Sequence, residues 1–116
     1  MTLSLEMITV DCVDPDTLAQ WWAQAVGGTV SALMPGEFMV GEKSSWLKLG
    51  FQRVDDPTPG KNRVHLDFTA ADQEAEVARL ARLGAREIER HSFGDEFSWV
   101  VLADPEGNEF CILAAE

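Results

Sequence analysis

Two side chains suited to proton transfer and metal binding lie two positions apart in residues 63–72, which read Arg-Val-His-Leu-Asp-Phe-Thr-Ala-Ala-Asp. Apolar and polar residues alternate through this segment, as they do in a β-strand with one buried face. The alternation places His65 and Asp67 on the same face of the predicted strand. An imidazole beside a carboxylate can act as a proton-transfer couple, so His65 and Asp67 are the candidate catalytic residues.

Strand-then-helix patterns occur twice in the chain, at a constant spacing. Asp14 and Asp72 are typical N-cap residues, and they lie 58 residues apart (72 − 14). Gly27 and Gly84 are typical of helix ends, and they lie 57 residues apart (84 − 27). Each helix is preceded by one strand and followed by about three, which predicts a tandem duplication of a βαβββ module. We expect the strands at residues 3–12, 29–33, 38–41, 46–54, within 63–72, and at 85–90, 96–103 and 107–114.

Apolar residues at helical and strand spacing predict which faces are buried. The buried positions that we expect are Leu18, Trp21, Trp22 and Ala25 on the first helix, Val77, Leu80, Ala81 and Gly84 on the second, and Val64, Leu66 and Phe68 on the strand between them.

His91 directly follows the strand expected at residues 85–90, so we expect it in a turn.

A length of 116 residues predicts a single domain of the α+β class. We expect module 1 at about residues 3–54 and module 2 at about residues 63–116. The linker between them, residues 55–62, contains two prolines and one glycine. The hydrophobic fraction of 46% and the charged fraction of 25% are typical of folded globular proteins.

The net charge of −11 argues against nucleic-acid binding and against adsorption to anionic membranes, because both need basic surface. An acidic surface instead attracts cationic partners. The sequence shows no secretory signal and no apolar run long enough to span a membrane. We therefore expect a soluble cytoplasmic protein.

The duplication also predicts a binding site. If the two modules pack about a pseudo-twofold axis, their polar strand faces meet in a concave cup with both helices outside, the natural place for a ligand. Trp46 and Trp99 are candidates for an aromatic wall of this cup. Each module has an exposed sheet edge, which we expect a homodimer or pairing between modules to cover. The candidate ligand-binding residues are Met7, Thr9, Asp11, His65, Asp67, Trp99 and Cys111.

The paired βαβββ modules, the His-x-Asp before the second helix and the closing segment Asp-Pro-Glu-Gly-Asn-Glu-Phe-Cys-Ile-Leu resemble the vicinal oxygen chelate superfamily. This superfamily includes glyoxalase I, extradiol dioxygenases and bleomycin-resistance proteins. The resemblance covers residues 3–114 and is strongest to small glyoxalase-like domains. It implies an incomplete, barrel-like cup of eight strands with the helices outside.

The resemblance also implies where a divalent metal would bind, since enzymes of this superfamily hold one with a ligand from each of four strands, typically His or Glu. The first of these positions falls on Met7, which is no ligand for such a cation. The second falls among Lys48, Gly50 and Gln52, none of which is a carboxylate. The third and fourth fall on His65 and Cys111, which are the two candidate ligands.

Two good ligands fall short of the usual three or four, so we expect no metal cofactor. The leading functional hypothesis is therefore a glyoxalase- or bleomycin-resistance-like protein that binds a small molecule without the usual metal. The alternative is a divalent-metal-dependent lyase, isomerase or dioxygenase. A third possibility is a sensor or interaction domain whose cup is filled by side chains.

Cys12 and Cys111 are the only cysteines. Strand parity places Cys12 on the helix-facing side of its strand and Cys111 on the cup-facing side, which does not suit a disulfide. We expect two free thiols, with Cys111 the more reactive if the cup is open to solvent.

Overall fold

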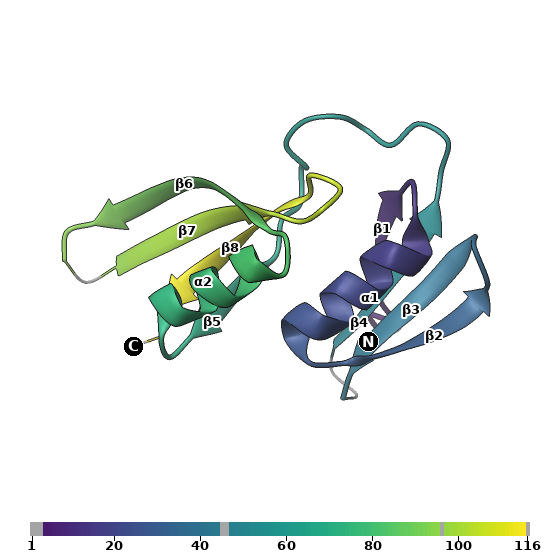
Figure 1. The fold of residues 1–116 in the computed structure, drawn as a ribbon, viewed down its shortest axis with the longest axis horizontal. Coiled ribbons are helices and arrows are strands. Elements are labelled where there is room, and N and C mark those ends of the chain that lie inside the picture. The colour runs from purple at the N-terminus through teal and green to yellow at the C-terminus, as the bar shows by residue number, and fades with distance from the viewer. Residues whose placement is uncertain (1–3, 45–46, 96, 116) are drawn as a thin grey trace. The chain divides into compact units, whose positions relative to one another are not determined.

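The computed structural model describes residues 4–44, 47–95 and 97–115 (Figure 1). The chain divides into two compact units, Met1–Pro57 and Thr58–Glu116. Each unit contains one helix and one four-stranded sheet.

The first unit follows the order strand, helix, three strands. Its sheet has the strand order β1-β4-β3-β2, in which β1 runs parallel to β4 and the other pairs are antiparallel. The elements are β1 (Ile8–Cys12), α1 (Pro15–Val26), β2 (Thr29–Met34), β3 (Phe38–Lys43) and β4 (Leu47–Arg53).

The second unit repeats this order. Its sheet has the strand order β5-β8-β7-β6, with β5 parallel to β8 and the other pairs antiparallel. The two tandem βαβββ modules and the α+β class are therefore confirmed. The expected cup concerns the packing of the two units together, and it stays a prediction. The elements are β5 (Asp67–Ala70), α2 (Gln73–Arg82), β6 (Arg86–Phe93), β7 (Phe97–Ala103) and β8 (Glu109–Ala114).

Both helices begin at the predicted caps. The Asp14 side chain accepts a hydrogen bond from the backbone N–H of Thr17 at 3.1 Å, and that of Asp72 accepts one from Ala75 at 3.1 Å. Each carboxylate satisfies an N–H that has no partner within the helix. Helix α1 ends at Gly27, whose φ of 79° is the left-handed conformation that glycine adopts without strain.

The core of the first unit lies between α1 and its sheet. Leu18, Trp21 and Trp22 are buried as predicted, whereas Ala25 is only half-buried. The two indole rings meet edge to face with centroids 5.1 Å apart. Phe51 of β4 is completely buried. This apolar layer fixes the helix on one face of the sheet.

In the second unit α2 buries a narrower stripe than the sequence predicts. Val77 and Leu80 are buried, but Ala81 and Gly84 are exposed, so the prediction for these two residues is wrong. Ala81 lies one position past Leu80 on the helix, about 100° further around the axis, and turns to solvent. Gly84 instead supplies the turn after the helix, where its φ is 113°.

A side-chain amide ties the start of α2 to two strands. Gln73 Nε2 donates to the carbonyl oxygens of Ser98 on β7 (3.3 Å) and Ile112 on β8 (2.9 Å). The Ser98 hydroxyl donates back to Gln73 Oε1 at 3.2 Å. These hydrogen bonds hold α2 against one face of the sheet, the same face from which Phe68 extends.

The strand expected within residues 63–72 begins only at Asp67, and its buried face is shorter than predicted. Phe68 packs edge to face on Phe110 at 6.2 Å, but Phe68 and Leu66 are only half-buried, and Val64 is 74% exposed. Val64 therefore does not face the helix. The ladder hydrogen bonds explain this, because pairing with β8 starts at the carbonyl of Leu66.

Among the described residues, no helix is long and apolar enough to span a membrane.

Candidate functional site

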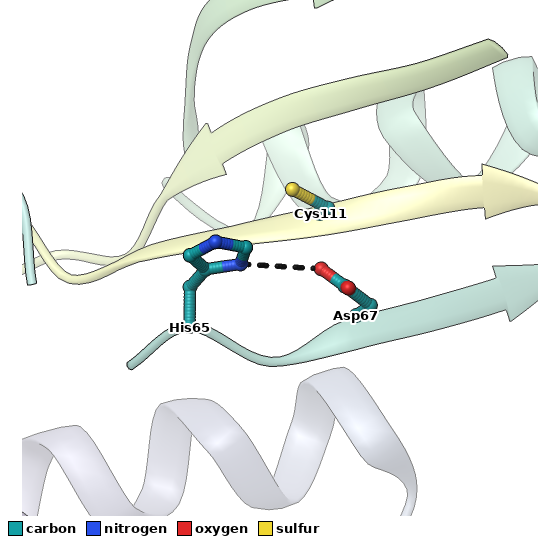
Figure 2. Close-up of side chains that lie close together, drawn as sticks. All are labelled: His65, Asp67 and Cys111. Atoms are coloured by element: carbon teal, nitrogen blue, oxygen red, sulfur yellow. Dashed lines mark hydrogen bonds and ion pairs between the residues drawn. The ribbon is translucent and has the colours of Figure 1, made fainter. Parts of the chain in front are cut away.

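Three chemically active side chains meet on the sheet of the second unit, as Figure 2 shows: His65, Asp67 and Cys111. His65 Nδ1 lies 3.2 Å from Asp67 Oδ1. One nitrogen, oxygen or sulfur atom from each residue lies within 4.8 Å of the other two. His65 and Asp67 are exposed, whereas Cys111 is only 7% exposed. We call these three residues the polar trio.

Strand register assembles the polar trio. Asp67 on β5 lies directly opposite Cys111 on the parallel strand β8, so both side chains extend from the same face of the sheet. His65 precedes β5 by two residues and joins them on that face (Figure 2). Pairing β5 with β8 in this register therefore adds the thiol to the His-x-Asp pair found in the sequence.

The segment that carries His65 is held in place by Asn62. Its side-chain oxygen accepts a hydrogen bond from the backbone N–H of Glu109 at 2.7 Å. Its side-chain nitrogen donates to the Glu109 carbonyl at 3.2 Å and also to the carbonyl of Val64. The carboxamide of Asn62 thus both donates to and accepts from the backbone of Glu109, as the backbone of a paired strand residue does. It does so just before β5 begins. Sequence reasoning missed Asn62, because it lies in the predicted linker and its partner is far away in the sequence.

The electrostatics of the polar trio favour a neutral thiol. Burial raises the pKa of Cys111 to about 11, with further contributions from a hydrogen bond to Asp67 and from its negative charge, while Lys61 acts in the opposite sense. Both cysteines are free, as predicted. However, a nearly buried thiol that keeps its proton is a poor nucleophile. We therefore expect Cys111 to react slowly at neutral pH, and its reactivity relative to Cys12 stays a prediction.

The first unit has an equivalent set of positions with different chemistry. Thr9 on β1 lies opposite Gly50 on β4, as Asp67 lies opposite Cys111. A Cβ atom on Gly50 would lie 2.9 Å from Thr9 Oγ1 and 3.0 Å from Met7 Sδ, so these three residues adjoin one another. The first unit thus holds a thioether and a hydroxyl where the second holds an imidazole and a carboxylate. Of the predicted ligand-binding residues, Met7, Thr9 and Asp11 belong to the first unit, and His65, Asp67, Trp99 and Cys111 to the second.

Trp99 belongs to a group of four rings on β6 and β7. It stacks on His91, with ring centroids 4.9 Å apart and planes at 21°. Phe93 and Phe97 lie 5.4 and 5.5 Å from Trp99, and their own rings are nearly parallel at 6.3 Å. We call these residues the aromatic cluster. The prediction of a turn at His91 is wrong, since β6 continues to Phe93 and its pairing with β7 places His91 opposite Trp99.

The aromatic cluster lies on the same face of the sheet as the polar trio. Val101 pairs with Cys111 on β8 and Trp99 pairs with Leu113, so alternate residues from β8 to β7 share this face. On β6, the His91 imidazole lies 3.1 Å from the carboxylate of Glu89. The face therefore runs from polar groups on β5 and β8 to aromatic rings on β7 and β6. Trp46, the other proposed aromatic wall residue, lies outside the described residues.

The polar trio offers donors that suit zinc: an imidazole nitrogen, a carboxylate oxygen and a sulfur atom. Tetrahedral zinc places such donors about 3.3–3.8 Å apart, given bonds of about 2.0–2.3 Å. Donors within 4.8 Å would reach that geometry after shifts of about 1 Å. The Cys111 thiol would also have to lose its proton. The donor types of the polar trio therefore fit a divalent metal.

Two βαβββ repeats and a His-x-Asp sequence ahead of the second helix define a protein of the vicinal oxygen chelate superfamily. The chain belongs to the glyoxalase-like domain family, whose sequence profile matches residues 7–113. A search of curated proteins gave no significant match.

Solved structures show the same fold. A glyoxalase/bleomycin resistance protein/dioxygenase family enzyme from Burkholderia phytofirmans superimposes with a TM-score of 0.81 at 19% identity, covering 98% of this chain and 100% of that one. A lactoylglutathione lyase from Agrobacterium tumefaciens gives 0.70 at 14% identity, covering 97% and 93%. The oxidase ChaP-H1 gives 0.71 at 22% identity, covering 99% and 98%. At these identities the likeness concerns the fold alone.

Proposed function

We propose that this protein binds a small molecule, without a resident metal, on the face of the second-unit sheet that carries the polar trio. The observation that carries the proposal is the meeting of His65, Asp67 and Cys111 on a sheet face that also carries Val101, Leu113 and Trp99. The predicted contribution of Met7, Thr9 and Asp11 to the same site stays a prediction.

The mixture of groups on this face suits a small organic ligand. His65 and Asp67 are exposed and able to exchange hydrogen bonds with a ligand, while the half-buried Trp99 supplies apolar surface on the same face of the sheet. Small-molecule sites are typically apolar with a few well-placed polar groups that fix orientation. Asn62 adds rigidity, because its bonds to β8 hold the segment that carries His65.

Hydrogen bonding within the polar trio supports binding without a metal. The Asp67 carboxylate contacts the His65 imidazole and is also hydrogen-bonded to the Cys111 thiol. The negative charge of the site is therefore already partnered. The equivalent positions of the first unit, Met7 and Gly50, add no donor for a hard or borderline cation.

Native mass spectrometry of freshly purified protein tests the proposal. We expect a co-purifying small molecule that is lost in His65→Ala and in Asp67→Asn. Asp55→Asn is the matched control, since Asp55 is an exposed carboxylate of the first unit paired only with Arg53 among the described contacts. Retention of the ligand in Asp67→Asn to the same extent as in Asp55→Asn would show that it binds elsewhere.

The zinc-type donor set supports a second candidate, a metal-dependent lyase, isomerase or dioxygenase. His65, Asp67 and Cys111 would hold the ion, which as a Lewis acid would polarise an oxygen atom of the substrate. The remaining chemistry of the site would be orientation of the substrate by the adjoining apolar face. Elemental analysis of protein purified without chelators separates the candidates. A stoichiometric metal that disappears in His65→Ala and falls in Cys111→Ser would establish the second candidate and overturn the first.

The expected homodimer also stays a prediction. The same native spectra report the number of subunits, so one measurement addresses ligand, metal and assembly together.

A further inference from the structure

The aromatic cluster is unusually open for so many rings. Phe93 is 72% exposed and Phe97 is 42% exposed, with the half-buried Trp99 between them and the body of the sheet. Exposed apolar groups scattered singly need no explanation, but a contiguous group on a soluble protein marks a binding surface. Phe93 and Phe97 take no part in the core, in which Phe110 packs against Phe68 on the opposite face of the sheet.

The rings form two stacked pairs, and the rings of Phe93 and Phe97 are tilted by 44° and 50° to that of Trp99. His91 and Trp99 are within 21° of parallel, and Phe93 and Phe97 are within 20° of parallel. Their strands pair directly, His91 opposite Trp99 and Phe93 opposite Phe97, so the backbone ladder fixes the spacing of the rings. An open group of fixed rings favours an aromatic partner, which can make face-to-face or edge-to-face contact with them.

The acidic residues near the aromatic cluster favour a positively charged partner. Asp95 lies in the turn between β6 and β7, two positions from both Phe93 and Phe97, and residues 91–103 contain no lysine or arginine. The last basic residue of the chain, Arg90, points its guanidinium at Glu74 and Glu87, with N–O distances of 2.6–3.0 Å. Glu89, in contrast, lies beside the aromatic cluster, with its carboxylate 3.1 Å from the His91 imidazole. Aromatic faces and nearby carboxylates both attract cations.

We propose that the aromatic cluster binds the planar, positively charged aromatic part of a small-molecule ligand. The inference rests on the proposed function, and it names the class of ligand and a second contact region on the same face. The polar trio takes the hydrogen-bonding part of the ligand, and His91, Phe93, Phe97 and Trp99 take the flat cationic part.

The test uses proflavine, a planar aromatic cation, and pyrene-1-sulfonate, a planar aromatic anion, as fluorescent probes of full-length protein. Binding is measured by anisotropy at pH 8 and in 150 mM salt, which screens non-specific attraction to the acidic surface. We expect proflavine to bind and pyrene-1-sulfonate to bind at least about tenfold more weakly. Phe93→Ala should weaken proflavine binding by about tenfold, which is the loss of one well-stacked ring.

Three further variants make this expectation specific. Leu33→Ala is the matched control, because Leu33 is also an exposed apolar residue (66% exposed) but lies on the edge strand β2 of the first unit. The Leu33→Ala variant should bind proflavine with the affinity of the wild type. Phe93→Tyr keeps the ring and should keep the affinity, which separates loss of stacking from loss of folding. Glu89→Gln should weaken proflavine binding severalfold and leave binding of pyrene-1-sulfonate unchanged or stronger.

Three results would overturn the inference. They are equal proflavine affinity in Phe93→Ala and the wild type, equal affinity for the two probes, and conversion of a dimer to a monomer by Phe93→Ala with proflavine binding intact. The last result would mean that a second copy of the chain covers the cluster. The native mass spectrometry of Asp67→Asn tests the proposed function separately. If Asp67→Asn loses the co-purifying ligand while Phe93→Ala binds proflavine as the wild type does, only the role of the aromatic cluster is rejected and the proposed function stands.

Discussion

Gly50 and Cys111 occupy equivalent positions in the two units. Gly50 lies opposite Thr9 in the parallel pair of β1 and β4, and Cys111 lies opposite Asp67 in the parallel pair of β5 and β8. The register has been kept while the side chains have diverged. In the first unit, Gly50 has no side chain and Met7 lies against it. In the second unit, the Cys111 thiol lies beside a carboxylate and an imidazole.

The first prediction concerns the space above Gly50. A Cβ atom there would lie 2.9 Å from Thr9 Oγ1 and 3.0 Å from both Met7 Sδ and Phe38 Cζ, closer than side chains pack. We expect Gly50→Ala to lower the free energy of unfolding by about 1–3 kcal/mol, the usual cost of overpacking. Urea denaturation at neutral pH measures the change.

Gly41→Ala provides the matched control for Gly50→Ala. Gly41 also lies on a strand of the first unit, but its nearest neighbour would be Phe51 Cε2 at 3.5 Å, an ordinary contact. Its substitution should therefore cost less than that of Gly50. Met7→Ala should relieve part of the loss in Gly50→Ala, since it removes a sulfur atom that would lie 3.0 Å from the new methyl group. Equal losses at Gly41 and Gly50 would contradict the crowding.

The second prediction concerns Asn62. Asn62→Ala removes the carboxamide that pairs with the backbone of Glu109, and leaves a partly buried N–H and C=O without that partner. We expect unfolding to become easier by about 1–3 kcal/mol. We also expect the ring-proton chemical shifts of His65 to change, because the segment that carries it loses its anchor.

Gln73→Ala is the control for Asn62→Ala. Gln73 is a second side-chain amide that bonds to backbone carbonyls of the same sheet, but it does so on the helix-facing side. Its loss should also lower stability, yet leave the His65 ring shifts in place. If both variants move those shifts alike, Asn62 acts on the whole unit and does not specifically position His65.

The third prediction concerns the pH dependence of thiol alkylation. Because the pKa of Cys111 is raised to about 11, its reaction with iodoacetamide should be slow at pH 7 and accelerate steeply between pH 9 and 11. Asp67→Asn removes a negative charge and a hydrogen-bond acceptor that favour the protonated thiol, so it should lower the pKa and speed the reaction at pH 8. The measurement uses a Cys12→Ala background, so that Cys111 is the only thiol. A wild-type rate already maximal at pH 8 would rule out the raised pKa.

The fourth prediction concerns acid stability. Hydrogen bonds from Arg90 lower the pKa of Glu74 and of Glu87 below the usual value of 4.5. A lowered pKa in the folded state contributes stability that is fully present above pH 4.5 and is lost as the pH falls through the lowered values. Arg90→Gln removes this contribution, so the stability difference between wild type and variant should shrink on acidification from pH 6 to pH 3. Denaturation midpoints across this range measure it, and a difference that grows on acidification would contradict the assignment.

Local chemistry in the sequence determined where the helices begin, the turn at residues 104–107 and the repeat. Asp14 and Asp72 cap their helices, and Gly27 ends the first, through bonds between residues three or four positions apart. The turn after β7 closes through Gly107 N–H and the Asp104 carbonyl at 2.9 Å, over the same short range. His65 and Asp67 likewise share a face because alternation is a property of the extended chain itself.

The tertiary structure decided which distant residues join that pair. Cys111 meets Asp67 only through the register of β5 against β8, and His91 meets Trp99 only through the register of β6 against β7. Register depends on hydrogen bonds between strands far apart in the sequence, and a shift of one residue would turn every side chain to the other face. The sequence by itself therefore determined the modules and the His-x-Asp pair. Non-local strand pairing completed the polar trio, extended β6 to Phe93 and left the aromatic cluster open to solvent.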